Sequence, residues 1–304
     1  MEAAASRYHE VYARSLRDPE GFWGKAAQAI DWYEPARQVF APEAGVYGRW
    51  FVGATCNTCH NAVDRHVAAG RGAQPALVYD SAVANVKRVF TYAELRDEVS
   101  RFGGILQDFG VGRGDRIILY MPMVPEAVIA MLACARIGAV HMVVFGGFSA
   151  DALASRLDDS GAVLVITSDG GYRRGAPSAL KPAVDDAVGR SPGVRNVVVV
   201  KRTEQDVEWT EGRDLWWDDV VERQSTEHTP EAFDAEHPLY IMYTSGTTAK
   251  PKGILHTTGG YLTQVAYTHW ATFDLKPDTD VYWTAADVGW VTGHSYIVYG
   301  PLAN

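Results

Sequence analysis

Segments typical of buried strands alternate with segments typical of helices through the middle of this 304-residue chain, and this alternation restricts the fold more than any other feature. The strand-like segments are short runs rich in β-branched residues, and the helix-like ones carry apolar residues at helical spacing. We expect strands at 117–120, 140–144, 163–167 and 197–200, and helices at 91–109, 125–138, from Ser149 onward and at 178–188. This order predicts an α/β fold with a doubly wound, mainly parallel sheet and flanking helices.

The ends of these helices carry recognisable signals. Thr91 and Glu94 have the spacing of a capping box, and Gly110 follows the last apolar residue of the same helix. Pro125 opens the next helix and Gly138 closes it. Because doubly wound sheets bind ligands beyond the carboxyl ends of their strands, we expect the site in the loops that follow strands.

The flanking parts of the chain are less regular. Residues 1–75 are rich in tryptophan, tyrosine and proline, and we expect a helix-and-loop extension packed on a main body formed by 76–304. Residues 201–237 are charged and contain three tryptophans, which is typical of a connecting segment anchored on the surface.

Composition excludes several classes of protein. Lysine and arginine number 28 against 37 acidic residues, so the net charge of −9 disfavours nucleic-acid binding. The apolar runs are much shorter than the roughly 20 residues that cross a bilayer, and the N-terminal residues lack the apolar core of a secretory signal. Three cysteines cannot form a disulfide framework in a chain of this length. We therefore expect a soluble cytoplasmic protein with no membrane or nucleic-acid partner.

One cysteine pair offers a different interpretation. Cys56, Cys59 and His60 match the C-x-x-C-H pattern of c-type haem attachment, which would make the protein an exported electron carrier. The export signal that such attachment needs is missing, and a structural zinc site would require two more ligands nearby. We favour a surface-to-core turn that leads into a helix, and we expect no metal site.

The segment after the expected strand 239–243 carries the strongest chemical signal. It has two glycines that permit close backbone approach, four hydroxyl side chains that donate to anionic oxygens and two lysines. The order of residues differs from the Walker pattern, which disfavours a GTPase-like or kinase-like loop. On composition alone, a phosphate cradle and a hydroxyl-rich surface turn both remain open. The segment consists of Thr244, Ser245, Gly246, Thr247, Thr248, Ala249, Lys250, Pro251, Lys252 and Gly253.

With Tyr243, this segment resembles the signature of the adenylate-forming superfamily, which includes acyl-CoA synthetases, luciferases and peptide-synthetase adenylation domains. Further stretches resemble its acetyl- and propionyl-CoA synthetase branch, and the resemblance runs from about Phe22 to the end. These stretches are 120–127, 131–139, 145–149 and 286–296. Residues 211–217 and 256–261 are most similar to acetyl-CoA synthetases, whereas 59–66 is more similar to the propionyl enzymes.

The resemblance implies that residues 76–304 are part of the large N-terminal domain of an adenylate-forming enzyme. Such enzymes use ATP with Mg²⁺ to convert a short acid to an acyl-adenylate, then transfer the acyl group to CoA. The implied catalytic residues are Thr244 and Lys252. The implied phosphate-binding residues are Thr244, Ser245, Gly246, Thr247, Thr248, Lys250 and Lys252. The implied acyl pocket is Trp290, Val291 and Thr292, and the implied CoA site is Phe145, Gly146, Gly147 and Arg173.

Three positions bear on how closely the family pattern applies. Thr292 stands where propionyl relatives usually carry valine, so we expect acetate rather than propionate, although one methylene gives only about 1–3 kcal/mol of discrimination. Ala249 replaces a usual glycine, and Ala176 stands where a second arginine is common. Trp290 and Val291 also fit an ordinary core.

Other functions remain as alternatives. A propionyl-CoA synthetase is one alternative, and an aryl or longer-chain acid ligase would need a more open pocket than Trp290 and Thr292 suggest. A noncatalytic nucleotide-binding module would keep the cradle without turnover. The family's later motifs lie beyond Asn304, so we expect these 304 residues to be a truncated chain with impaired activity.

Overall fold

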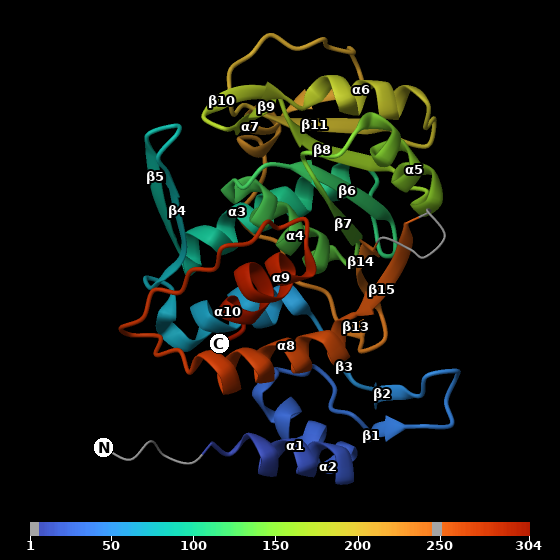
Figure 1. Ribbon diagram of the computed structural model, residues 1–304, viewed down its shortest axis with the longest axis vertical. Coiled ribbons are helices and arrows are strands. Elements are labelled where there is room, and N and C mark those ends of the chain that lie inside the picture. Colours follow the sequence, from blue (N-terminus) through green and yellow to red (C-terminus); the bar gives the residue numbers. More distant parts are fainter. Residues whose placement is uncertain (1–5, 245–250) are drawn as a thin grey trace.

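A seven-stranded sheet runs through the part of the chain that the structure describes, residues 6–244 and 251–304 (Figure 1). In this computed structural model the strand order is β12-β11-β8-β6-β7-β14-β15, and every neighbouring pair is parallel except β14 with β15. The strands are β6 (Arg116–Met121), β7 (Val140–Phe145), β8 (Leu164–Ser168), β11 (Asn196–Val200), β12 (Asp214–Trp216), β14 (Pro238–Thr244) and β15 (Lys252–Thr257). The predicted α/β fold with a doubly wound, mainly parallel sheet is confirmed.

Helices cover both faces of this sheet. Ile117 and Leu119 of β6 belong to one hydrophobic core, and Ile118 and Tyr120 belong to the other. The first core lies under α3 (Tyr92–Asp108) and α4 (Pro125–Ile137), and the second lies under α5 (Ala150–Ser160) and α6 (Lys181–Gly189). Because both faces are covered, the central strands consist mainly of buried apolar residues.

The helix-end signals act as expected. The backbone N–H of Glu94 donates to Oγ1 of Thr91 over 3.2 Å, and the backbone N–H of Thr91 donates to Oε2 of Glu94 over 2.8 Å, which completes the capping box. Gly138 ends α4 with a φ of 72°, in the left-handed region. A methyl group there would lie 2.6 Å from ring atoms of Phe233, so both conformation and packing require glycine.

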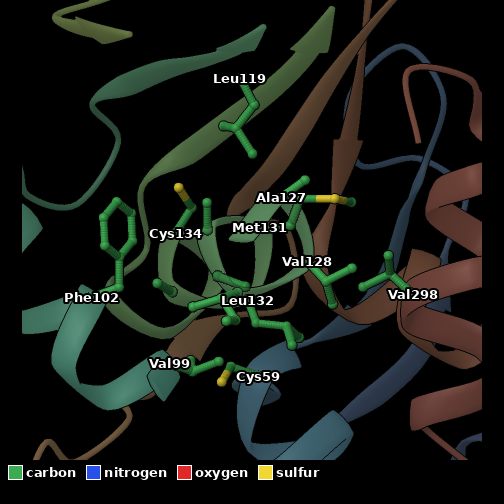
Figure 2. Packing of buried hydrophobic residues seen from close by; sticks show 14 of the residues in the cluster. Cys59, Val99, Phe102, Leu119, Ala127, Val128, Met131, Leu132, Cys134 and Val298 are labelled. Carbon is green, nitrogen blue, oxygen red and sulfur yellow. The ribbon is translucent and has the colours of Figure 1, made fainter. Parts of the chain in front are cut away.

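Helix α4 is the centre of the first core. It is buried on all sides because it packs against the sheet, α3, residues around Cys59 and residues near the C-terminal end of the described chain. Figure 2 shows residues of α4 in contact range of side chains from distant parts of the sequence: Cys59, Val99, Phe102, Leu119 and Val298. The N-terminal region and the main body thus share one continuous core.

The N-terminal region contains more strand than the sequence suggested. Its helices are α1 (Tyr8–Arg17), α2 (Pro19–Ala26), η1 (Ala27–Ala29), η2 (His60–Asp64) and η3 (Val67–Arg71), and its strands are β1 (Gln38–Ala41), β2 (Arg49–Val52) and β3 (Thr55–Cys56). Strand β3 pairs with β13 (Phe233–Asp234), and α2 contacts α8 (Thr258–Phe273). The region therefore packs against the last third of the described chain.

Two hairpins and a group of short helices complete the fold. The hairpin of β4 (Pro75–Ser81) and β5 (Val86–Thr91) projects from the body in Figure 1, and β9 (Gly170–Arg173) pairs with β10 (Ala176–Ala179). The short helices are α7 (Trp217–Val221), α9 (Val291–Gly293), η4 (His294–Tyr299) and α10 (Gly300–Leu302).

Two predictions from the sequence were only partly right. Residues 201–237 are not only a surface connection, because β12 within them forms one edge of the main sheet and pairs with β11. The helix predicted from Ser178 begins at Lys181, since residues up to Ala179 belong to β10.

A buried ion pair fixes the edge strand β12 to α6. The side chain of Lys181 is fully buried, and its Nζ donates to Oδ2 of Asp214 over 2.8 Å and to Oδ1 of Asp185 over 2.7 Å. The carbonyl oxygen of Glu208 accepts a third hydrogen bond from Nζ at 3.1 Å. All three ammonium protons are therefore satisfied without water.

Replacing Lys181 with methionine is expected to lower the free energy of unfolding by about 2 kcal/mol, because it removes one of the two cations that hold the buried carboxylate of Asp214, while Arg213 remains paired with it. Urea unfolding followed by tryptophan fluorescence measures this change. Lys87→Met is the matched control, since Lys87 and Asp80 form an exposed pair at 3.3 Å. Equal losses in the two variants would contradict the structural role given to Lys181.

Candidate functional site

Two neighbouring strands bring the predicted motifs to one edge of the sheet. Strands β7 and β14 run parallel, and Tyr240 pairs with His141. Phe145 and Thr244 lie the same number of residues beyond this pair, so the two strands end at the same level. The glycine turn after β7 and the hydroxyl-rich segment after β14 therefore begin side by side, at the edge where such sheets bind ligands.

The two predicted catalytic residues are brought together in the β14–β15 hairpin. Thr244 pairs with Lys252 across the hairpin, and both are exposed. A hydroxyl and an ammonium group thus flank the segment that joins the two strands. The remaining predicted phosphate-binding residues lie outside the described part of the chain: Ser245, Gly246, Thr247, Thr248 and Lys250, together with Ala249.

The predicted CoA residues also lie together. A methyl group added at Gly147 would lie 3.0 Å from Nη2 of Arg173, so glycine lets the guanidinium lie against the turn. The hydroxyl of Tyr120 donates to the carbonyl oxygen of Phe148 over 2.7 Å and lies 3.1 Å from that of Gly146. Burial raises the pKa of Tyr120, which keeps this hydroxyl protonated. The hydroxyl of Tyr120 therefore holds the backbone of this turn, and the guanidinium of Arg173 lies against Gly147.

The hairpin of β9 and β10 positions Arg173. Its turn consists of Arg174 and Gly175, which both have positive φ, 52° and 81°. Ala176 pairs with Arg173, so it lies beside the arginine at the base of the turn. The alanine leaves this position without the second cation that the resemblance would place there.

The three predicted acyl-pocket residues separate in the structure. Gly289 packs against the backbone of Phe145, since a methyl group there would lie 3.0 Å from the backbone nitrogen of Phe145. The ring of Trp290 follows, with its centre 6.1 Å from that of Phe145 and 6.2 Å from that of Phe148. Trp290 is half-exposed and lies with the predicted CoA turn.

Val291 and Thr292 line a different space. They face a cleft of about 620 Å³ whose walls come from β2, β15, α8 and η4. Five aromatic side chains line it, and its polar lining residues are His256, Thr257, Gln264, Thr292 and Ser295. This combination suits a small ligand that has an apolar part and a few polar contacts. Trp290 does not line the cleft.

A buried group of histidine and tyrosine side chains connects these parts, and sequence reasoning missed it. Nε2 of His141, in β7, lies 2.6 Å from the hydroxyl oxygen of Tyr299, and the ring of His141 stacks on that of His294 with centres 5.4 Å apart. Nδ1 of His294 lies 3.0 Å from the carbonyl oxygen of Trp290. A lone histidine in an apolar strand was the available signal for a buried polar partner.

Burial also sets the charge of these groups. Burial lowers the pKa of His294 to about 4, and it lowers the pKa of His141 well below its ordinary value. Both imidazoles are therefore neutral near pH 7. We call residues 289–292 the Trp290 segment. The buried histidines and tyrosine behind it thus carry no charge that would compete for an anionic substrate.

The cysteine pair is part of the core. Cys56 and Cys59 are fully buried, and burial raises the pKa of each thiol to about 12. Nη1 of Arg136 lies 3.4 Å from Sγ of Cys59 and also forms an ion pair of 2.8 Å with Asp64. The pair leads into η2, as the turn-and-helix interpretation predicted.

The described residues lack two kinds of feature. Within 6–244 and 251–304, no three histidine, cysteine or acidic side chains gather in a way that could hold a metal ion. Among the helices of the same residues, none is both long and apolar enough to cross a membrane.

Two family profiles together match nearly the whole chain. The AMP-binding enzyme family matches residues 64–304, which include β7, β14, β15 and the Trp290 segment. A profile described as the N-terminus of acetyl-coenzyme A synthetase matches residues 8–62.

Curated relatives agree with these profiles. An acetyl-coenzyme A synthetase of Streptomyces avermitilis is 59% identical over 304 residues, which are 100% of this chain and 46% of the relative. Acetyl-coenzyme A synthetases of Mycolicibacterium smegmatis and Salmonella typhi are 56% and 50% identical over 99% and 98% of this chain, covering 32% and 46% of their own lengths. The chain thus spans half or less of the length of these relatives.

Gly289→Ala is expected to destabilise the protein by about 1–3 kcal/mol, because the new methyl group meets backbone atoms of Phe145 that cannot move easily. Urea unfolding gives the magnitude. Gly260→Ala is the control, since its methyl group meets no atom within 4 Å and alanine favours the helix α8. A Gly289→Ala variant as stable as Gly260→Ala would contradict the close contact between the Trp290 segment and the turn.

The buried histidines predict a loss of stability in acid. Above about pH 6.5 His294 is neutral in both the folded and the unfolded protein, so its titration should not change the free energy of unfolding. As the pH drops toward 4, this titration should lower the free energy of unfolding by about 3 kcal/mol. The unfolded histidine takes up its proton near pH 6.5, whereas the folded one does so near pH 4. Urea unfolding between pH 8 and 4.5 should therefore show a shallower pH dependence in His294→Asn than in wild type. His9→Asn, which alters an exposed histidine, should leave the slope unchanged, and equal slopes in all three proteins would refute the assignment.

Proposed function

Because this chain belongs to the AMP-binding enzyme family, we propose that the complete protein joins acetate to CoA in two steps driven by ATP. In the first step an acetate oxygen attacks the α-phosphorus of ATP and pyrophosphate leaves, which forms acetyl-adenylate. In the second step the CoA sulfur attacks the acetyl carbon, and AMP leaves with the bonding electron pair. The relatives named acetyl-coenzyme A synthetase support this reaction.

The observation that carries the proposal is the meeting of three segments at the carboxyl edge of the sheet. The turn after β7 contacts the Trp290 segment through Gly289, and β14 ends beside that turn. A reaction that uses three substrates in one place needs three recognition elements within reach of one another. The nucleotide, the CoA arm and the acid would each meet one of these segments.

At the ATP end, Thr244 and Lys252 would contact the triphosphate of the Mg²⁺–ATP substrate. Their pairing across the hairpin supports this role, because it places a hydroxyl and a cation at the two ends of the loop. The loop residues between them, Ser245–Thr248 and Lys250, would supply further donors. Such donors stabilise the charge that develops on the departing pyrophosphate, a type of contact worth about 100- to 1000-fold in rate.

At the CoA end, Arg173 and the Gly146–Gly147 turn would hold the nucleotide part of CoA. The contact of the guanidinium with Gly147 supports this assignment, because an arginine fork suits phosphate oxygens. Phe145 and Trp290 would border the path of the thiol arm. Ala176 leaves Arg173 without the second arginine that is common in the family.

The acid would lie on the side of Val291 and Thr292, which line the cleft described above. Thr292 supports acetate over propionate, since propionyl enzymes usually carry a second valine at this position. We also propose that the protein acts in the cytoplasm, which is supported by three free, buried cysteines. The division into an extension, 1–75, and a partial adenylation domain, 76–304, stays a prediction.

The complete protein should form acetyl-CoA in a reaction that depends on ATP and acetate. Its kcat/KM for acetate should exceed that for propionate by about tenfold, since one additional methylene must be excluded, and butyrate should react more slowly still. Coupled release of AMP and pyrophosphate with each acid measures these ratios.

Lys252→Met and Lys87→Met provide a matched pair for this assay. Lys252→Met should reduce acetate-dependent exchange of pyrophosphate into ATP by about 100-fold, whereas the exposed Lys87 on β5 lies outside the site. If the protein prefers propionate, the proposed substrate is propionate and not acetate. ATP and CoA binding without turnover on any acid would indicate a noncatalytic module instead.

A further inference from the structure

Arg156, in α5, has its guanidinium beside two aromatic rings from different parts of the site. Its Cζ lies 4.9 Å from the ring centre of Phe148 and 5.3 Å from that of Tyr243. Phe148 directly follows the Gly146–Gly147 turn, and Tyr243 directly precedes Thr244. One cation thus contacts both the turn proposed for CoA and the strand that leads into the loop proposed for ATP.

The surroundings of Arg156 are unusual for a charged residue. The residue is only 7% exposed, and among the described residues no carboxylate lies within ion-pair distance of its guanidinium. Nη1 donates to the carbonyl oxygen of Ala152 over 2.6 Å. Burial lowers the pKa of Arg156, so the charge is desolvated. Two ring faces and the carbonyl oxygen of Ala152 therefore lie around the guanidinium, and cation–π contacts are strongest where water is excluded.

The same helix contacts Tyr243 a second time. The hydroxyl of Tyr243 donates to Oδ2 of Asp159 over 2.7 Å, and Asp159 lies on the same face of α5 as Arg156. Burial raises the pKa of Tyr243, so its hydroxyl remains a donor. Helix α5 therefore holds the ring face and the hydroxyl of the last residue before Thr244.

We infer that Arg156 is a positioning residue that couples the end of β14, where the nucleotide end of the proposed site begins, to the turn proposed for CoA. Because one guanidinium contacts both Phe148 and Tyr243, a displacement of one ring that carries the guanidinium with it weakens the contact with the other ring. Ordering one substrate end should then favour the bound geometry of the other end. This inference rests on the proposed function for the identity of the two ligands.

Equilibrium binding tests this coupling without requiring turnover. Calorimetric titration of the complete protein would use CoA and, separately, Mg²⁺ with a non-hydrolysable ATP analogue. Arg156→Met keeps an unbranched side chain and removes the charge and the guanidinium, and it should weaken both ligands by about tenfold. Arg156→Lys retains a cation between the rings and should recover most of the affinity for both.

Arg190→Met is the matched control. Arg190 contacts the same helix, through a 2.7 Å ion pair with Asp151, but lies over neither ring. It should leave both dissociation constants unchanged. Calorimetry also separates positioning from folding, because partial unfolding lowers the number of sites per chain while leaving the dissociation constant of the folded fraction unchanged.

A second variant tests whether the effect passes through the cation. Phe148→Leu removes the ring on the CoA side, and in the presence of Arg156 it should weaken the ATP analogue several-fold at a distance. In the Arg156→Met background the same change should affect CoA alone. Additive effects on the ATP analogue in both backgrounds would overturn the coupling.

The outcomes distinguish this inference from the proposed function. If wild type binds both ligands and Arg156→Met leaves either dissociation constant unchanged, or changes only the number of sites, the coupling is wrong while the function stands. If wild type binds both ligands, Arg156→Met weakens both, and no acid is activated, the function is wrong while the coupling stands. Failure of wild type to bind either ligand would overturn both.

Discussion

The candidate site depends first on the parallel pairing of β7 with β14. This pairing sets the end of one strand beside the end of the other, so a glycine turn and a hydroxyl-rich loop from distant parts of the sequence begin at the same edge. Since side chains alternate along a strand, a shift of one residue would turn the side chains of β14 to the opposite face. The buried pair of Tyr240 with His141 therefore fixes which groups meet at the edge.

A second constraint connects the Trp290 segment to this edge. His141 approaches Tyr299 and stacks on His294, and Gly289 lies directly on the backbone of Phe145. These contacts are made by neutral rings and by a glycine, not by ion pairs. They hold the segment close to the turn through uncharged groups.

Local patterns were enough to predict most of the central fold. The capping box at Thr91, the left-handed Gly138 and the apolar runs of the parallel strands act through nearby residues, so the sequence alone identifies them. Strands β12 and β15 were not predicted, because each takes its extended form from a neighbouring strand and lacks a strand-like apolar run of its own.

In the candidate site, too, the sequence predicted the residues that belong to local motifs but not the contacts that depend on tertiary packing. Similarity of motifs identified Arg173 and the Trp290 segment, but only packing reveals that Trp290 lies with Phe145 while Val291 and Thr292 line a separate cleft. Arg156 reads in the sequence as an ordinary charged position of an amphipathic helix. Its contacts with two rings depend on strands that are distant in sequence.

The most direct test is a crystal structure of the complete protein with CoA, Mg²⁺ and a non-hydrolysable ATP analogue. The account predicts the nucleotide phosphate beside Thr244 and Lys252, with the CoA arm passing between the Gly146–Gly147 turn and Trp290. Binding of either ligand away from this edge of the sheet would contradict the claim that these segments form one site.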